Sequence, residues 1–231
     1  MTTSPKFRIR DAGAVEGDDQ FVVAAFDAVI PYLTSIGSHE QWGTIPFSHR
    51  EGWVDETVQQ IEDSSKSSAF QGDQNKNGVL RIFIVEKECN ADGPEYFDRP
   101  LAHYRVSSDR RRYLSVGFAF VRENWIPGYI ESQKHLQIPE AERENNIYLE
   151  VMVTDCRVGS LRRGAGSALI QGIRDYGRKK QKKAFCLDGW AGNDKKLVHY
   201  YENQGFQVVG DFSLPRANKA PWVGTLMRMD I

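Results

Sequence analysis

The most informative stretch of the sequence is 161-LRRGAGSALIQGIRDYGRKK-180, in which a glycine-containing loop runs directly into a helical pattern. Its small and apolar residues recur at the spacing of one face of an α-helix. The residues of this face are Ala165, Ala168, Leu169, Gly172, Ile173 and Tyr176. The pattern predicts an amphipathic helix from about Gly164 to Lys180 whose N-terminus carries the loop.

The loop before this helix is suited to bind an anion. The first amides of a helix have no intrahelical partner and carry the positive end of the helix dipole. Gly164 and Gly166 allow a phosphate to approach the main chain, and Arg162 and Arg163 add positive charge. The loop therefore predicts a phosphate or diphosphate site. A tight turn with solvated arginines is the simpler alternative.

The elements around the loop indicate a mixed α/β chain (α+β). The predicted strands are 7–10, 80–85, 113–121, 148–154, 184–188, 206–212 and 223–229. The predicted helices are 19–36, 48–64, 164–180 and 194–204, with Ser48 and Glu51 forming a capping box at the start of the second. We expect a single domain over residues 1–231, with insertions at about 88–112 and 122–147.

The composition indicates a globular protein and disfavours nucleic-acid-binding and membrane-spanning proteins. The 231 residues are 40% hydrophobic and 26% charged with a net charge of −1, which favours an ordinary globular protein without affinity for nucleic acid. No apolar run approaches the ~20 residues that cross a bilayer. The three cysteines form no CxxC pair, which favours a reduced compartment. We expect a cytoplasmic monomer or homodimer with no metal, nucleic-acid or membrane partner.

Two other phosphate-binding motifs were compared with the loop. The GxxxxGK[ST] pattern of a P-loop is absent. A dinucleotide site needs GxGxxG followed by an acidic residue, and Asp188 lies 22 residues after Gly166. However, Leu169 occupies the third glycine position, and Gly164 comes ten residues after the strand that ends at Thr154. A dinucleotide-binding oxidoreductase is therefore a less favoured alternative.

A second motif, 201-YENQGF-206, ends the last predicted helix. The order of strand, Arg-rich GxG loop, helix, strand, helix and YENQGF resembles the GCN5-related N-acetyltransferase (GNAT) superfamily, with its (Q/R)xxGx(G/A) and YExxGF motifs. The resemblance spans about Tyr148 to Phe212, and Leu161 stands where the family usually has Gln or Arg. It implies a central mixed, mostly antiparallel twisted sheet, splayed between its fourth and fifth strands and flanked by about four helices.

The resemblance also implies a site for acetyl-CoA in the splay, between strands 148–154 and 184–188. The residues expected around the pyrophosphate are Leu161, Arg162, Arg163, Gly164, Ala165, Gly166 and Ser167. The pantetheine arm is expected to pair with the main chain of Val151, Met152 and Val153. Asn193, before the last helix, either hydrogen-bonds pantetheine or caps that helix.

Acyl transfer to an amine needs a base for the amine and an acid for the departing thiolate. Tyr201 occupies the family position of the thiol-protonating tyrosine, and a phenol with a pKa of ~10 is protonated at neutral pH; a core tyrosine is the alternative. Glu150 is the candidate base, because a carboxylate in an apolar strand is costly unless it is paired or functional. Asp188, at the end of the next strand, is the other candidate. Alternation places Glu150 on one face with Tyr148 and Met152. A structural ion pair with an arginine is the rival interpretation.

The acceptor side is expected to include Trp42, Tyr148 and Asp188, with the insertion that holds Trp125 and Tyr129 as a lid. The acceptor is a small-molecule or peptide amine. The sequence thus predicts an N-acetyltransferase that moves an acetyl group from acetyl-CoA directly to a primary amine. A catalytically inactive GNAT module that binds acyl-CoA is the main alternative.

Overall fold

The computed structural model describes residues 7–67, 78–89 and 102–231, and within them eight strands form one sheet. The strands are β1 (Phe7–Asp11), β2 (Val79–Cys89), β3 (Tyr104–Val106), β4 (Arg112–Glu123), β5 (Asn146–Thr154), β6 (Ala184–Trp190), β7 (Gln207–Arg216) and β8 (Lys219–Asp230). Their spatial order is β1-β2-β4-β5-β6-β8-β7, with β3 beside β4 outside this path. Only β5 and β6 pair in parallel. The mixed, mostly antiparallel sheet confirms the predicted fold class and differs from the parallel sheet of a dinucleotide-binding fold.

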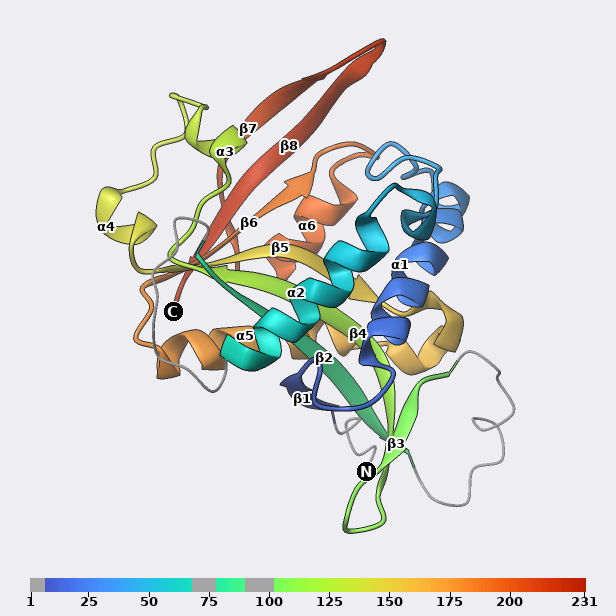
Figure 1. The fold of residues 1–231 in the computed structure, drawn as a ribbon. Coiled ribbons are helices and arrows are strands. Elements are labelled where there is room, and N and C mark those ends of the chain that lie inside the picture. Colours follow the sequence, from blue (N-terminus) through green and yellow to red (C-terminus); the bar gives the residue numbers. More distant parts are fainter. Residues whose placement is uncertain (1–6, 68–77, 90–101) are drawn as a thin grey trace.

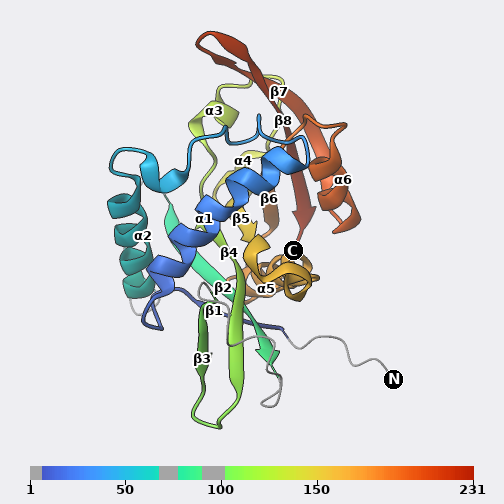
Figure 2. The ribbon, with the colours of Figure 1, turned by 90° about the vertical axis from the view of Figure 1, so that its right-hand side faces the viewer.

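Helices cover both faces of the sheet (Figures 1 and 2). The described helices are α1 (Asp18–Ser35), α2 (Trp53–Ser67), α3 (Gly128–Glu131), α4 (Glu140–Arg143), α5 (Ala165–Lys179) and α6 (Lys196–Asn203), with 3-10 turns η1 (Phe47–His49) and η3 (Cys156–Arg162). On one face α1 and α2 pack over Ile82, Ile84 and Phe118, and on the other α5 packs over Phe83, Leu149 and related residues. The predicted stripe of α5 faces this second core, since Ala165, Leu169 and Ile173 are fully buried.

The start of the second helix was predicted wrongly. Ser48 lies in η1, where its amide donates to the Asp27 carboxylate (2.9 Å), so no capping box with Glu51 forms. Gly52 then turns the chain with a φ of 68°, and α2 begins at Trp53. Pro31 lies inside α1 and does not end it.

The two expected insertions differ in how much of them the structure describes. Residues 90–101 of the first lie outside the described residues, and β3 supplies a short strand from Tyr104 onward. The second contains α3 and α4, and its residues Ile126, Ile130 and Leu136 pack with Phe212 and Leu226 of the β7–β8 hairpin. This insertion therefore covers the half of the sheet that lies beyond β5.

The sheet opens between β5 and β6, where the splay was expected. These strands pair only from Asn146 opposite Ala184 to Leu149 opposite Leu187. Beyond that point β5 stays with β4, and β6 stays with β8. Glu150 and Asp188 are therefore the first residues past the last paired position on the two strands.

Candidate active site

A groove of about 870 Å³ lies along the splayed part of β5, between the start of α5 and helix α6. It is lined on one side by Met152, Val153 and Thr154 of β5, and on the other by Leu197, Tyr200 and Tyr201 of α6. The end of α1 closes it with Val29, Tyr32 and Leu33, and the glycine loop supplies Arg162, Arg163, Gly164, Gly166 and Ser167. The groove thus brings the two sequence motifs together.

The glycine loop presents free main-chain donors to this groove. Gly164 precedes α5 with a left-handed φ of 88°, and a Cβ atom there would lie 3.2 Å from the Phe7 ring. The first amide bonded within the helix is that of Ala168, which donates to the Gly164 carbonyl (3.0 Å). The amides of residues 165–167 therefore have no intrahelical partner, which is the arrangement that the predicted anion site requires.

The arginines of the loop have different surroundings. The Arg162 guanidinium donates to the carbonyl (3.3 Å) and hydroxyl (3.1 Å) oxygens of Thr154 and lies 4.5 Å from the ring centre of Tyr32. Arg162 thus fastens η3 to the end of β5, while Arg163 lines the groove. Both arginines remain close enough to contribute positive potential to the groove.

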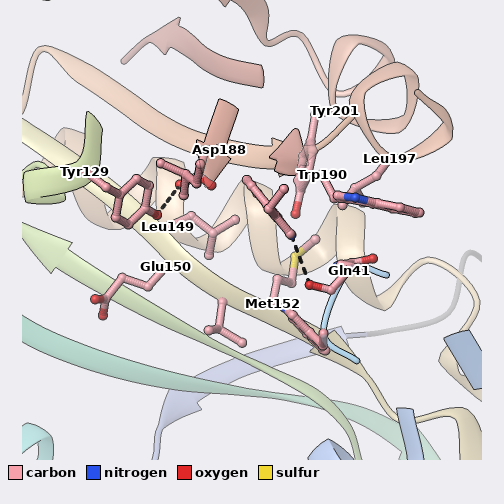
Figure 3. Close-up of a pocket in the computed structure, with 13 residues that line it drawn as sticks. Gln41, Tyr129, Leu149, Glu150, Met152, Asp188, Trp190, Leu197 and Tyr201 are labelled. Carbon is pink, nitrogen blue, oxygen red and sulfur yellow. Dashed lines mark hydrogen bonds between the residues drawn. The ribbon is translucent and has the colours of Figure 1, made fainter. Parts of the chain in front are cut away.

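A second cavity of about 340 Å³ adjoins the groove (Figure 3). The two spaces share Gln41, Trp42, Met152, Leu197 and Tyr201. The remaining residues that line the second cavity are Tyr129, Leu149, Glu150, Val151, Asp188, Trp190, Leu214 and Trp222. We call this cavity the acceptor pocket. The fold therefore gathers Trp42, Glu150, Asp188 and Tyr201, all predicted as site residues, around one space.

Tyr201 stands at the junction of the two cavities and points its hydroxyl into the pocket (Figure 3). Its side chain is only 6% exposed. Burial raises the pKa of the Tyr201 phenol, and the nearby Tyr200 and Asp188 raise it further. Tyr201 is therefore protonated over the physiological pH range and is available as a proton donor.

Glu150 occupies a β-bulge. Leu149 pairs with Val121 and Val151 pairs with Phe120, so Glu150 is the extra residue of β5. The bulge corrects the predicted alternation: Met152 packs with Leu149 on the α5 face, not with Tyr148. Because the bulge takes Glu150 out of the regular ladder, its carboxylate reaches the lining of the acceptor pocket.

The Glu150 carboxylate also forms the ion pair that was the rival interpretation. The Arg122 Nε lies 2.9 Å from Glu150 Oε1, and both side chains are mostly buried. Burial raises the pKa of Glu150, Arg122 lowers it and Asp188 raises it, with a net upward shift. An ion pair and a raised pKa coexist at this carboxylate, so pairing does not by itself decide its role.

Asp188 lies across the splay from Glu150. Its Oδ1 accepts hydrogen bonds from the hydroxyls of Tyr129 (2.9 Å) and Tyr148. Burial raises the pKa of Asp188, and the two phenols lower it, with a net upward shift. Tyr148 is fully buried and does not line the pocket, so it supports Asp188 from behind.

The arrangement of strands resembles that of solved acetyltransferase structures. Ribosomal-protein-alanine N-acetyltransferase from Brucella melitensis superposes with a TM-score of 0.53 at 13% sequence identity, over 97% of this chain and 99% of that chain. An acetyltransferase of the GNAT family from Streptococcus pneumoniae gives 0.52 at 13% identity, over 98% and 100%. This chain has the GNAT fold.

A third similar structure, described as an acetyltransferase from Salmonella typhimurium, was solved with its cofactor acetyl-CoA. It gives a TM-score of 0.50 at 12% identity, over 97% of this chain and 93% of that chain. A scan against family models and a search of curated proteins found no match. The likeness in structure therefore establishes the fold at sequence identities too low to carry over residue roles.

Two residues of the predicted glycine loop lie outside the lining of the groove, and a third predicted residue lines it without capping α6. Leu161 packs against the core on the α5 face, and Ala165 is fully buried. Asn193 does not cap α6, which begins at Lys196. Its amide nitrogen donates to Ile36 O (2.9 Å) and Ser38 Oγ (2.8 Å), which ties the turn before α6 to the end of α1.

Several groups at the site of this GNAT fold were not predicted. The Tyr200 hydroxyl hydrogen-bonds Ser167 beside the glycine loop, although the YExxGF motif assigns no role to Tyr200. Trp190 lies two residues after Asp188 on β6, so strand alternation alone would have placed the two on one face. Trp222, from β8, carries no local signal, because only the tertiary fold brings it to the pocket.

Within residues 7–67, 78–89 and 102–231, no three His, Cys, Asp or Glu side chains group as metal ligands. No helix in those ranges has the length and apolar character needed to span a membrane.

Proposed function

We propose that the protein is an N-acetyltransferase that moves an acetyl group from acetyl-CoA directly to a primary amine. One observation carries the proposal: the groove that starts at the unpaired α5 amides meets, at Tyr201, a pocket that holds two carboxylates. Direct transfer requires both reactants in one continuous space, because holding them together removes much of the entropic barrier. The GNAT fold and a neighbour of that fold with bound acetyl-CoA support the same proposal.

The groove offers groups suited to each part of acetyl-CoA. The amides of residues 165–167 would hold the pyrophosphate, with Arg163 adding charge and the Tyr200–Ser167 pair at its edge. The main chain of residues 151–153 would pair with the pantetheine arm, since β5 has left β6 there. Asn193 also lines the groove, where it would hydrogen-bond the pantetheine arm. Bound acetyl-CoA supplies the acetyl group as an activated thioester.

The chain's own residues would then manage two protons. Glu150 Oε accepts a proton from the acceptor nitrogen, a task favoured by its raised pKa. Tyr201 Oη, which its raised pKa keeps protonated at working pH, donates a proton to the departing sulfur as the C–S bond breaks. The second proton that the charged acceptor nitrogen loses on forming the amide restores the phenol. The Arg122 guanidinium, 2.9 Å from Glu150, holds the carboxylate in position.

The same ion pair is the observation that favours a second candidate. A carboxylate paired with Arg122 also suits a GNAT module that binds acyl-CoA without transferring the acyl group. In that case acetyl-CoA would bind, and no amine would release free thiol from it.

Calorimetry followed by a turnover assay tests both candidates. Acetyl-CoA is titrated into the protein, with NAD and ATP as controls, and we expect micromolar binding of acetyl-CoA alone. Thiol release with a panel of amines then separates the enzyme from the binding module. If neither acetyl-CoA nor longer acyl-CoAs bind, both candidate functions are contradicted.

A further inference from the structure

The acceptor pocket has an unbalanced charge. Two carboxylates, Glu150 and Asp188, line it, and none of the described residues that line it is Lys, Arg or His. Glu150 is balanced by Arg122, which stands behind it. Asp188 accepts hydrogen bonds from two neutral phenols and makes no ion pair with a described residue. The pocket therefore contains one carboxylate without a counter-ion.

Such a carboxylate favours a cationic ligand. Withdrawing an ionised carboxylate from water is costly unless a positive group compensates it. The hydroxyls of Tyr129 and Tyr148 fix Asp188 Oδ1, so the carboxylate is held in place before any ligand arrives. An ammonium ion beside it would gain a charge-assisted hydrogen bond with little reorganisation.

The walls of the pocket suit an apolar skeleton. Trp42, Trp190 and Trp222 line it together with Leu149 and Leu214. Aromatic faces attract cations and also bury apolar groups. A volume of about 340 Å³ lies at the small end of the range for ligand sites, which favours a small molecule over a peptide segment.

We propose that the acceptor is a small primary amine with an apolar or aromatic skeleton and no carboxylate, held as an ammonium ion by Asp188. An amino acid of the same skeleton would bring a second negative charge beside Asp188 and would find no cation in the lining. Asp188 is then the residue that sets this specificity. The role as acetyl acceptor depends on the proposed function, whereas the binding preference does not.

Matched pairs of ligands test the proposal on the intact protein. Phenethylamine is compared with phenylalanine, and isoamylamine with leucine, because each pair differs only by a carboxylate. Binding is followed by calorimetry and by the fluorescence of the pocket tryptophans, with and without acetyl-CoA. We expect each amine to bind at least roughly tenfold more tightly than its amino acid, the scale of one charge-assisted contact.

Variants assign the preference to Asp188. Asp188→Asn should weaken amine binding roughly tenfold and remove the preference over the amino acid. Asp211→Asn is the matched control, because Asp211 is exposed on β7, pairs with Lys195 and lies outside the pocket lining. If Asp188→Asn does not fold, Leu214→Lys places a positive charge in the same pocket and should weaken amine binding by a similar factor.

Each outcome bears on one of the two proposals. Equal or tighter binding of the amino acids, or no binding of any of the four ligands, overturns the inference even if acetyl-CoA binds. Unchanged amine affinity in Asp188→Asn removes Asp188 from the specificity. If the amines bind through Asp188 but acetyl-CoA does not bind, the inference about the pocket holds and the proposed transferase function is contradicted.

Discussion

Tyr200 and Tyr201 are neighbours in the sequence but reach different parts of the site. Tyr201 is almost fully buried where the groove meets the acceptor pocket. The Tyr200 hydroxyl instead hydrogen-bonds Ser167 at the first turn of α5. Adjacent phenols thus divide into one suited to chemistry and one suited to binding the phosphates, and substitution of each hydroxyl separates the two roles.

Tyr201→Phe should lower kcat roughly 10²-fold, the lower range for loss of a general acid, and leave acetyl-CoA affinity unchanged. Tyr200→Phe removes the same atom one residue away. It should raise the KM for acetyl-CoA and change kcat little, because its hydroxyl lies beside the loop. Steady-state kinetics of both variants make the comparison, and a Tyr201→Phe enzyme with normal turnover at every pH would remove Tyr201 from the mechanism.

Glu150→Gln tests the base through its pH dependence. The raised pKa of Glu150 means that the wild-type rate falls as the pH drops through that value, because a protonated carboxyl cannot accept a proton. Between the pKa of Glu150 and the amine pKa of about 10, Glu150 is ionised and the amine is still charged. The variant should show its largest loss of kcat/KM in this pH range. The measurement is kcat/KM against pH for both proteins. A loss of the same factor at all pH values would indicate a structural carboxylate paired with Arg122.

At the scale of the element, the first turn of α5 depends on Gly166 having no side chain. A Cβ atom there would overlap the hydroxyl of Tyr200. Gly166→Ala should therefore displace Tyr200 and weaken acetyl-CoA binding roughly tenfold, although Ala favours the helix by up to ~1 kcal/mol. Gly128→Ala is the matched control, because its Cβ would meet nothing within 4 Å. Calorimetry compares the two, and unchanged affinity in Gly166→Ala would contradict the pyrophosphate site.

The elements that sequence predicts well are those whose pattern is local. The α5 stripe, the strands and the YENQGF turn each repeat or end within a few residues, so the sequence locates them, whereas the position of the splay followed from the resemblance to the GNAT superfamily. The start of α2 was missed because Ser48 prefers a tertiary partner, Asp27, over a local cap. The aromatic wall of the acceptor pocket was missed because Trp190 and Trp222 meet Trp42 only in the folded sheet, and the Glu150 bulge reverses an alternation that sequence alone cannot see.

At the scale of the whole molecule, α1 connects the site to a buried ion-pair network. The helix begins at Asp18, which pairs with Arg10 (2.6 Å), and its last turns line the groove. Its 18 residues span about 27 Å at 1.5 Å per residue. Glu86 completes the network by pairing with Arg10 (2.5 Å) and Arg105 (2.6 Å). Stability and ligand binding are therefore supported at opposite ends of one helix.

Glu86→Gln should lower stability without affecting the site. The Glu86 side chain is 1% exposed, and removal of one partner of a buried pair costs about 3 kcal/mol near pH 7. Burial raises the pKa of Glu86, but hydrogen bonds from Arg105 and Arg10 outweigh it, so the net pKa is lowered. A carboxylate with a lowered pKa stabilises the fold at pH values above its unfolded pKa of ~4.3. This stabilisation is lost as the pH falls through the pKa of the folded state. The cost of the variant should therefore shrink as the pH falls below that window.

Urea unfolding at pH 7 and at about pH 3 measures this difference, with Glu88→Gln on the same strand as the control. Glu88 pairs with Arg111 at 3.6 Å, and the Arg111 side chain is half exposed, so its loss should cost less than about 1 kcal/mol at either pH. Because the network lies at the far end of α1, both variants should bind acetyl-CoA like the wild type while folded. A weaker affinity in Glu86→Gln would show that α1 transmits changes in the network to the groove, whereas a cost that did not vary with pH would mean that the Glu86 charge does not stabilise the fold.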